Sequence, residues 1–194
     1  MKHALNNNTI TIEYLKGLLS SEDIDELKQS FNDTDTLVEV KSYPPRVMAA
    51  IDELFSDIAI NLSSDVVSGI FIGVISNGVF AALISCLKKI RYRVKNKKLH
   101  KVSAGEITDK TPNVYIKIDN LNIQVPISAK DEEYEYFTEH VFESVKEQEF
   151  KMQTFCFFDE KTHSFVYKSI LEIGQYEYQK HIERERMKYI KNDP

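Results

Sequence analysis

The fold of this chain depends on one stretch, Val66 to Leu87, which reads VVSGIFIGVISNGVFAALISCL. It contains no charged side chain, and the basic sequence KKIRYRVKNKKLHK follows directly. A stretch of about 20 apolar residues is long enough to cross a bilayer. A helix that is apolar on every side is buried, either in lipid or in the centre of a soluble domain. These two destinations predict different proteins.

On a helix, residues four apart share a face, and this stretch then carries a continuous ladder of small side chains. The ladder consists of Gly69, Gly73, Asn77, Ala81 and Ser85. Because glycine within a helix costs about 1 kcal/mol relative to alanine, the pattern indicates close approach to a neighbouring backbone. In lipid such a ladder associates helices. In a soluble domain it lets a helix lie tightly on a sheet or on another helix, so we predict a helix-packing role.

The surrounding sequence favours the soluble interpretation. A single span would place the basic cluster on the cytoplasmic side, and residues 1–65 would then have to cross the membrane. The first residues, MKHALNNNTI, contain no apolar signal region. A span would also separate the strand-like segment Thr36–Lys41 from the other predicted strands. We predict a cytoplasmic protein; the alternative is a single-pass inner-membrane protein with a cytoplasmic C-terminus.

Hydrophobic periodicity predicts the remaining elements. Two hairpins are expected, NVYIKI–DN–LNIQVPI over residues 113–127 and MQTFCFF paired with HSFVYKS. Helical patterns occupy the following segments: two short helices within 11–31, an amphipathic helix over 45–60, a helix after 128 and a last helix over about 170–190. Ser20-x-x-Asp23 and Ser128-x-x-Asp131 are typical capping signals.

This order of elements predicts an α+β fold. We expect a mainly antiparallel sheet of about five strands, a fully apolar central helix over 66–87, and flanking amphipathic helices. A length of 194 residues suits one compact domain. We predict an N-terminal helical appendage over 1–35 and a single α+β domain over 36–194.

The sequence contains no motif typical of a catalytic or metal site. Its five histidines have neither H-E-x-x-H nor H-x-H spacing, and its two cysteines match no metal-site spacing. Gly73 and Gly78 have the spacing of P-loop glycines, but Val79 and Phe80 stand where Lys and Ser/Thr would bind phosphate and Mg²⁺. We therefore predict no metal, no cofactor and no enzymatic activity.

The basic segment predicts a binding surface. Residues 88–101 hold eight Lys or Arg and no acid, so the −5 of the whole chain leaves −13 for the remainder. An extended segment would place Lys89, Arg91, Arg93 and Lys95 on one face, where they could meet phosphates of nucleic acid or anionic lipid heads. The acidic remainder would repel a long polyanion. An acidic protein contact, within the chain or in a partner, is therefore favoured over nucleic acid.

Residues 36–148 contain a further pattern. A strand, Pro-Pro and a helix precede SNGVFAALISCLKKIR, with Gly78 and the turn Ala81-Ala82-Leu83, and the hairpin and an acidic helix follow. This order resembles effector-associated accessory domains, the constant components of bacterial conflict and defence systems. The chain departs from them at Ile90, where an aromatic residue is common. The resemblance implies a non-enzymatic adaptor that recruits or presents another protein.

These observations predict a non-enzymatic, soluble interaction or adaptor protein that binds a protein partner or a second copy of itself. The first alternative is a membrane-anchored, oligomerising effector whose small-residue ladder packs helices in lipid. The second alternative is a nucleic-acid-binding protein that uses residues 88–101.

Overall fold

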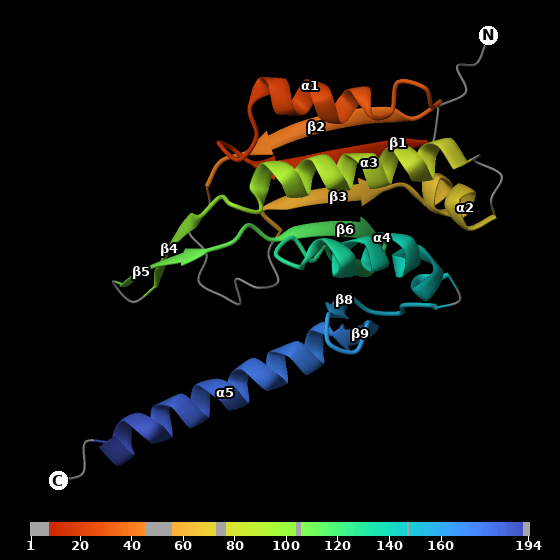
Figure 1. Ribbon diagram of the computed structural model, residues 1–194. Coiled ribbons are helices and arrows are strands. Elements are labelled where there is room, and N and C mark those ends of the chain that lie inside the picture. The colour runs from red at the N-terminus through yellow and green to blue at the C-terminus, as the bar shows by residue number, and fades with distance from the viewer. Residues whose placement is uncertain (1–7, 46–55, 73–76, 104–105, 147, 192–194) are drawn as a thin grey trace.

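The computed structural model describes residues 8–45, 56–72, 77–103, 106–146 and 148–191 (Figure 1). The helices are α1 Ser21–Gln29, α2 Ser64–Ile72, α3 Asn77–Val94, α4 Asp131–Val145 and α5 Ile170–Lys191. The strands are β1 Thr9–Leu15, β2 Leu37–Tyr43, β3 Ile58–Leu62, β4 Leu99–Ser103, β5 Glu106–Lys110, β6 Val114–Ile118, β7 Leu121–Gln124, β8 Thr154–Asp159 and β9 Ser164–Ser169.

Seven strands form one mixed sheet in the order β2-β1-β3-β6-β7-β8-β9. The pairs β1/β2, β3/β6 and β7/β8 are parallel, whereas β1/β3, β6/β7 and β8/β9 are antiparallel. Each parallel pair has at least one helix between its strands, because a parallel connection needs a crossover. The α+β class is therefore confirmed, but the mainly antiparallel sheet of about five strands is not.

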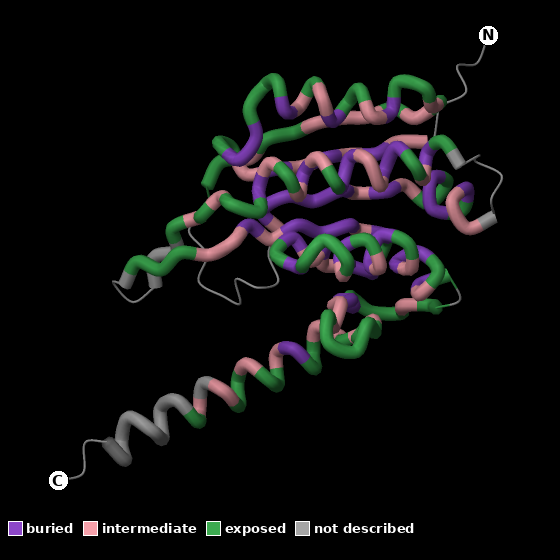
Figure 2. Tube along the Cα trace, viewed as in Figure 1, coloured by how far each residue is buried: buried purple, intermediate pink, exposed green. Residues whose placement is uncertain are grey.

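Helices α1, α3 and α4 lie side by side on one face of this sheet (Figure 1). Two elements extend away from this body, the separate hairpin β4–β5 and the long helix α5. Buried residues concentrate between the helices and the sheet, whereas α5 is half-buried or exposed over most of the length described (Figure 2).

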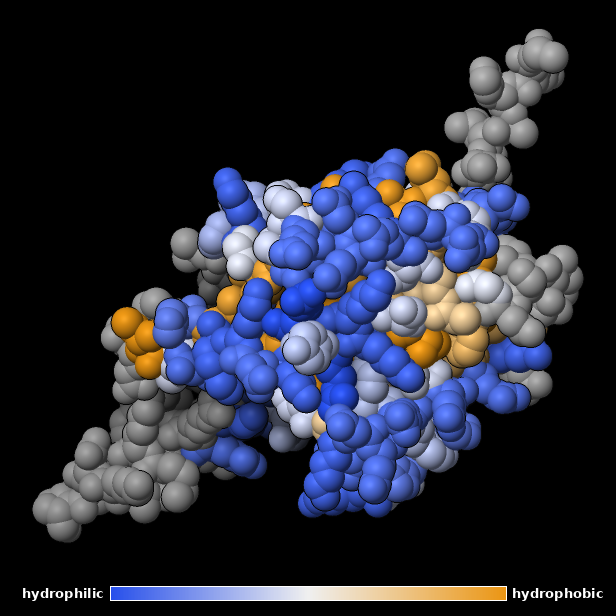
Figure 3. Space-filling model, turned by 45° about the horizontal axis from the view of Figure 1, so that its top comes forward, coloured by the Kyte–Doolittle hydropathy of each residue, from blue (hydrophilic) through white to orange (hydrophobic). Residues whose placement is uncertain are grey.

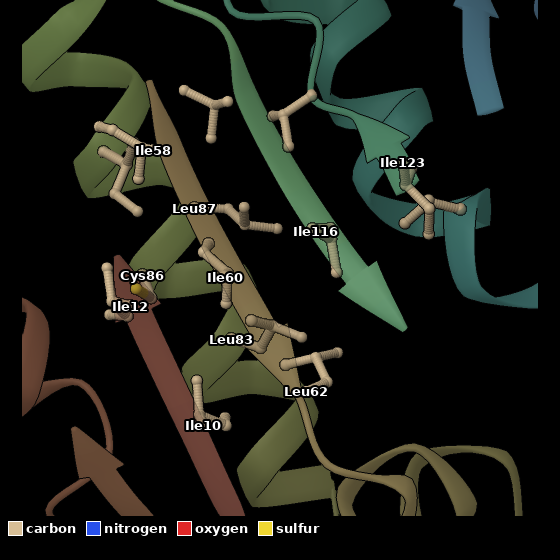
Figure 4. Packing of buried hydrophobic residues seen from close by; sticks show 14 of the residues in the cluster. Ile10, Ile12, Ile58, Ile60, Leu62, Leu83, Cys86, Leu87, Ile116 and Ile123 are labelled. Carbon is tan, nitrogen blue, oxygen red and sulfur yellow. The ribbon is translucent and has the colours of Figure 1, made fainter. Parts of the chain in front are cut away.

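The centre of the core is the contact of α3 with the middle strands (Figure 4). Leu83, Leu87, Ile90 and Val94 are fully buried and follow the helical spacing of three and four residues. They pack with apolar side chains of β1, β3, β6 and β7: Ile10, Ile12, Ile58, Ile60, Ile116 and Ile123. Cys86 and Cys156 are buried free thiols, as expected for small core residues.

The apolar stretch forms two helices rather than one. α2 ends at Ile72 and α3 begins at Asn77, so the predicted continuous helix over 66–87 is not confirmed. α3 continues through half of the basic segment, because Ile90 and Val94 extend its buried stripe beyond Leu87. Among the described residues, no helix has the length and hydropathy that a membrane span requires.

The N-terminal segment contributes a strand as well as a helix, so the first of the two helices predicted within 11–31 is wrong. β1 buries Ile10, Ile12 and Tyr14, a period of two that predicts a strand. It pairs with β2 and β3 and lies inside the sheet. The second helix and its cap are confirmed, because Ser20 and Asp23 form a capping box before α1.

Two other helix predictions need correction. Most of the predicted helix over 45–60 lies outside the described residues, but its end is strand β3, whose Ile58 and Ile60 face the core. The helix after Ser128 is present as α4, yet its N-cap is Lys130, without a side-chain cap, so the Ser128 capping prediction is wrong. Residues 58–62 are apolar enough for a buried helix or a buried strand, and pairing within the sheet makes them strand β3.

The strand at 36–41, both hairpins and the last helix are confirmed. β6 and β7 pair around the turn at Asp119, which has a φ of 46°. Such left-handed backbone suits Asp in a two-residue hairpin turn. β8 and β9 pair in the second hairpin, and α5 begins at Ile170.

Leu83→Ala should test the importance of the α3 contact. Removing this fully buried side chain should lower the free energy of unfolding by about 2–5 kcal/mol, because it leaves a cavity between α3 and the sheet. Urea denaturation provides the measurement. Tyr92→Ala on the exposed side of the same helix is the control and should change stability by less than about 0.5 kcal/mol. Equal losses in the two variants would contradict this account of the core.

Candidate functional site

A groove lies between the C-terminal half of α3 and the loop that leads into α4. Two adjoining open depressions, of about 310 and 460 Å³, share Arg91, Lys95 and Asp131. Their other lining residues are Lys88, Tyr92, Asn96, Ile127, Ser128, Ala129, Lys130, Tyr134 and Glu135. We call this surface the α3–α4 groove. Figure 3 shows that hydrophilic side chains dominate the helical face of the molecule, where hydrophobic ones reach the surface only in small groups.

Arg91 forms the base of the α3–α4 groove. Its Nε donates to the carbonyl oxygen of Ile127 at 3.2 Å, and its Nη2 donates to that of Ala129. Nη1 lies 2.8 Å from Oδ1 of Asp131, and the guanidinium lies 4.4 Å from the ring centre of Tyr134. The Arg91 side chain is only 12% exposed. It therefore ties the loop before α4 to α3 and holds the groove in one shape.

The contacts of Arg91 with the loop before α4, which we call the Arg91 clamp, also determine the electrostatics of the groove. The hydrogen bond and the charge of Arg91 hold the pKa of Asp131 below its ordinary value, so this carboxylate stays ionised. Burial raises the pKa of Tyr134, so its hydroxyl stays neutral. Within the described part of the chain, that hydroxyl has no hydrogen-bond partner.

The neighbouring cations of α3 point to α1 instead. Lys89 donates from Nζ to the carbonyl of Glu26 at 2.8 Å and to Oγ of Ser30 at 2.9 Å, at the negative C-terminal end of α1. Arg93 lies 2.9 Å from Asp23 Oδ1 and 2.6 Å from Glu26 Oε2. These contacts brace α1 against α3, and Lys97 adds a bond to the carbonyl of Leu18.

The four predicted cations therefore do not share one face. Lys89, Arg91 and Arg93 lie on α3, and Lys95 follows its last residue, so residues four apart are neighbours. Arg91 and Lys95 line the α3–α4 groove, whereas Lys89 and Arg93 contact α1. The prediction of an extended, alternating segment is wrong over 88–94. The helical period would have added Lys88 and Tyr92 to the groove, but no local signal brings in Lys130.

The small-residue ladder is divided between the two helices. Gly69 is buried on α2, Gly73 lies outside the described residues, and Asn77 opens α3. Ala81 is exposed and Ser85 is half-buried, so these two do not form the face of α3 that packs on the sheet. A tight-packing role for the ladder stays a prediction.

The metal-binding and nucleophilic side chains of the described residues are not arranged as a reactive site. In that part of the chain, no cluster of three or more His, Cys, Asp or Glu is placed to hold a metal. Burial raises the pKa of both cysteine thiols to about 12, which keeps them protonated and poorly nucleophilic.

Comparison of the chain with known protein families, with curated proteins and with solved structures finds no significant match.

Arg91→Ala should measure the contribution of the clamp. Loss of its bonds to two carbonyls and to Asp131 should lower the free energy of unfolding by about 2 kcal/mol, since buried carbonyls lose a charged donor. The control is Lys95→Ala, which lies four residues away and is exposed, and which should change stability by less than about 0.5 kcal/mol. If urea denaturation shows that Arg91→Ala leaves the free energy of unfolding unchanged, the contacts of Arg91 do not stabilise the loop.

The brace between α1 and α3 predicts a pH dependence. Burial would raise the pKa of Asp23, but hydrogen bonds with Ser20 and the charge of Arg93 outweigh it and hold the pKa below its ordinary value of 3.8. A depressed pKa in the folded state stabilises above the ordinary value, and this contribution disappears as the pH falls through the folded-state pKa.

Asp23→Asn should therefore lower the free energy of unfolding by about 1 kcal/mol at pH 7. The difference in free energy of unfolding between this variant and the unmodified chain should become smaller below about pH 4. Urea midpoints measured from pH 7 to pH 3 test this. Asp25→Asn, exposed on the same helix, should show no such dependence. A difference that stays constant over this range would show that the charge of Asp23 is not responsible.

Proposed function

We propose that this chain is a non-enzymatic interaction module that binds an acidic segment of a partner protein in the α3–α4 groove. The observation that carries the proposal is a set of lysine side chains that line the groove beside the floor formed by Arg91. The ammonium groups of Lys88 and Lys130 are exposed, and neither has a side-chain hydrogen bond or an ion pair within the described residues. Lys95 is also exposed, and its charge acts on the carboxylate of Asp131.

An aromatic side chain stands beside these cations. Tyr92 is 72% exposed, and the Arg93 guanidinium lies 5.7 Å from the centre of its ring. Exposed tyrosines next to polar groups are typical anchors of protein interfaces. Since the Arg91 clamp fixes the loop beneath them, binding would require little additional ordering. The groove therefore suits a short segment with acidic residues and one apolar or aromatic residue.

The charge of the groove supports protein over nucleic acid as the partner. Asp131 and Glu135 line the same surface as the lysines and would repel successive phosphates. The whole chain is acidic, with a formal charge of −5. A mixed-charge peptide can place its own cation against these two acids, which a nucleic acid cannot do.

The adaptor role is also supported by the resemblance of residues 36–148 to effector-associated accessory domains of bacterial conflict systems. We propose that the chain acts in the cytoplasm as a soluble accessory component rather than as a membrane-anchored effector. The burial of Leu83, Leu87 and Ile90 against the chain's own sheet supports this, since that face of α3 is already covered.

A fluorescence titration tests the groove. The probe is a labelled 12-residue peptide of glutamates with one tyrosine and one lysine, at 50 mM salt. We expect a Kd of about 10–100 µM, typical of a short charged motif. Reversal of the three groove lysines should weaken binding at least about tenfold, because it reverses the local potential. The variant combines Lys88→Glu, Lys95→Glu and Lys130→Glu.

The matched control reverses three exposed lysines outside the groove and should retain the affinity within about twofold. It combines Lys16→Glu, Lys151→Glu and Lys161→Glu. Absence of peptide binding at 50 mM salt, or equal losses in the two triple variants, would contradict the proposed site. Tighter, salt-dependent binding of a single-stranded oligonucleotide would replace the protein partner with nucleic acid.

A further inference from the structure

Helix α5 meets the body near its beginning and then leads away from it (Figure 1). It starts directly after β9 and contains 22 residues, so it is roughly 33 Å long at 1.5 Å per residue. Ile173 is the one buried side chain among those described on α5, and it packs with Tyr115 and Phe155 on the sheet. Farther along, α5 projects away from the sheet, and its residues of described burial between 174 and 183 are half-buried or exposed (Figures 1 and 2).

The face of α5 opposite Ile173 carries a row of large apolar residues. Leu171, Tyr178 and Ile182 are separated by 7 and 4 residues, which places them within about 20° of one line on a helix. Leu171 is 63% exposed and Tyr178 is 66% exposed. An apolar row of this length on a projecting helix is typical of a helix that packs against another helix.

Charge is distributed unevenly along α5. Residues 170–179 contain two glutamates and no Lys or Arg, whereas residues 181–191 contain four Lys or Arg and two glutamates. The first half is therefore acidic and the second half is basic. Two copies of this helix attract each other when they run in opposite directions and repel each other when they run in the same direction.

We infer that α5 pairs with α5 of a second copy of this chain in an antiparallel helix dimer. Centring the two-fold axis at residue 180 makes the apolar row self-complementary. Tyr178 then faces Ile182 of the second copy, and Ile182 faces Tyr178 of the second copy. An isologous two-fold interface of this kind closes on itself and produces a dimer rather than a filament.

This dimer goes beyond the proposed function. The α3–α4 groove includes no residue of α5, so the two surfaces can operate independently. Dimerisation would present two copies of the groove on one particle, which strengthens the binding of a partner that carries two acidic segments.

Sedimentation of the full chain tests the inference. The chain should be a dimer at about 50 µM, and Tyr178→Glu should weaken the dimer at least about tenfold, because it places a charge in the apolar row. Tyr176→Glu is the matched control, since Tyr176 lies on the other side of the same helix, between Lys168 and Lys180. Circular dichroism should confirm that both variants stay folded.

A cross-linking experiment tests the direction of pairing. Gln175 and Glu185 occupy positions that face each other only in the antiparallel arrangement centred at residue 180. A mixture of Gln175→Cys and Glu185→Cys chains should form mixed disulfides and few disulfides of either kind alone. Native thiols should not interfere, because Cys86 and Cys156 are buried.

Three results would overturn the inference. They are a chain that sediments as a monomer at about 100 µM, a dimer that is lost in Tyr176→Glu but kept in Tyr178→Glu, and efficient self-coupling of Gln175→Cys. None of these results bears on peptide binding in the α3–α4 groove, which is measured on its own variants.

Discussion

The packing of α3 on the middle strands of the sheet is the constraint on which the rest of the structure depends. Leu83, Leu87, Ile90 and Val94 form one stripe that contacts strands far apart in the sequence. Burial of such side chains contributes about 1.5–3 kcal/mol each, more than any surface contact of the same helix. Once this stripe faces the sheet, the direction of every other side chain on α3 follows.

The rotation of α3 explains how one basic segment serves two purposes. Lys89 and Arg93 share a face and brace α1, whereas Arg91 and Lys95 share another and line the α3–α4 groove. The first pair contributes to the stability of the domain. In the second pair, Arg91 holds the loop before α4, whereas Lys95, together with Lys88, leaves charge available for a partner. We therefore expect substitutions of Lys89, Arg91 or Arg93 to affect stability, and substitutions of Lys88 or Lys95 to affect binding.

The β9–α5 end of the molecule differs from the rest in its contacts. Ile173 attaches α5 to a small apolar cluster on the sheet face that does not pack on α3, and the remainder of the helix projects from the body. A single amphipathic helix in water gains little from its own propensity and depends on tertiary packing. An exposed apolar row on such a helix is consistent with a partner that completes its packing.

The sequence by itself determined the elements with a strong local period. The two hairpins, the α1 capping box and the α5 helix follow from alternation, turn chemistry and helical spacing. The burial of Val66, Val67, Val79, Leu83 and Leu87 in the apolar stretch also follows, since few environments other than a core or lipid accept so many apolar side chains. The absence of catalytic motifs narrowed the functional hypotheses but named no partner.

Only the tertiary structure decided the rest, because short apolar segments are ambiguous between helix and strand until they find neighbours. β1 and β3 are strands because they pair with each other, and parallel pairing depends on crossovers that no local signal specifies. The groove likewise joins Lys88 of α3 and Lys95, directly after α3, to Lys130, about forty residues away along the chain. The sequence supplied the charges, and packing of α3 and α4 on the same sheet brought them to one surface.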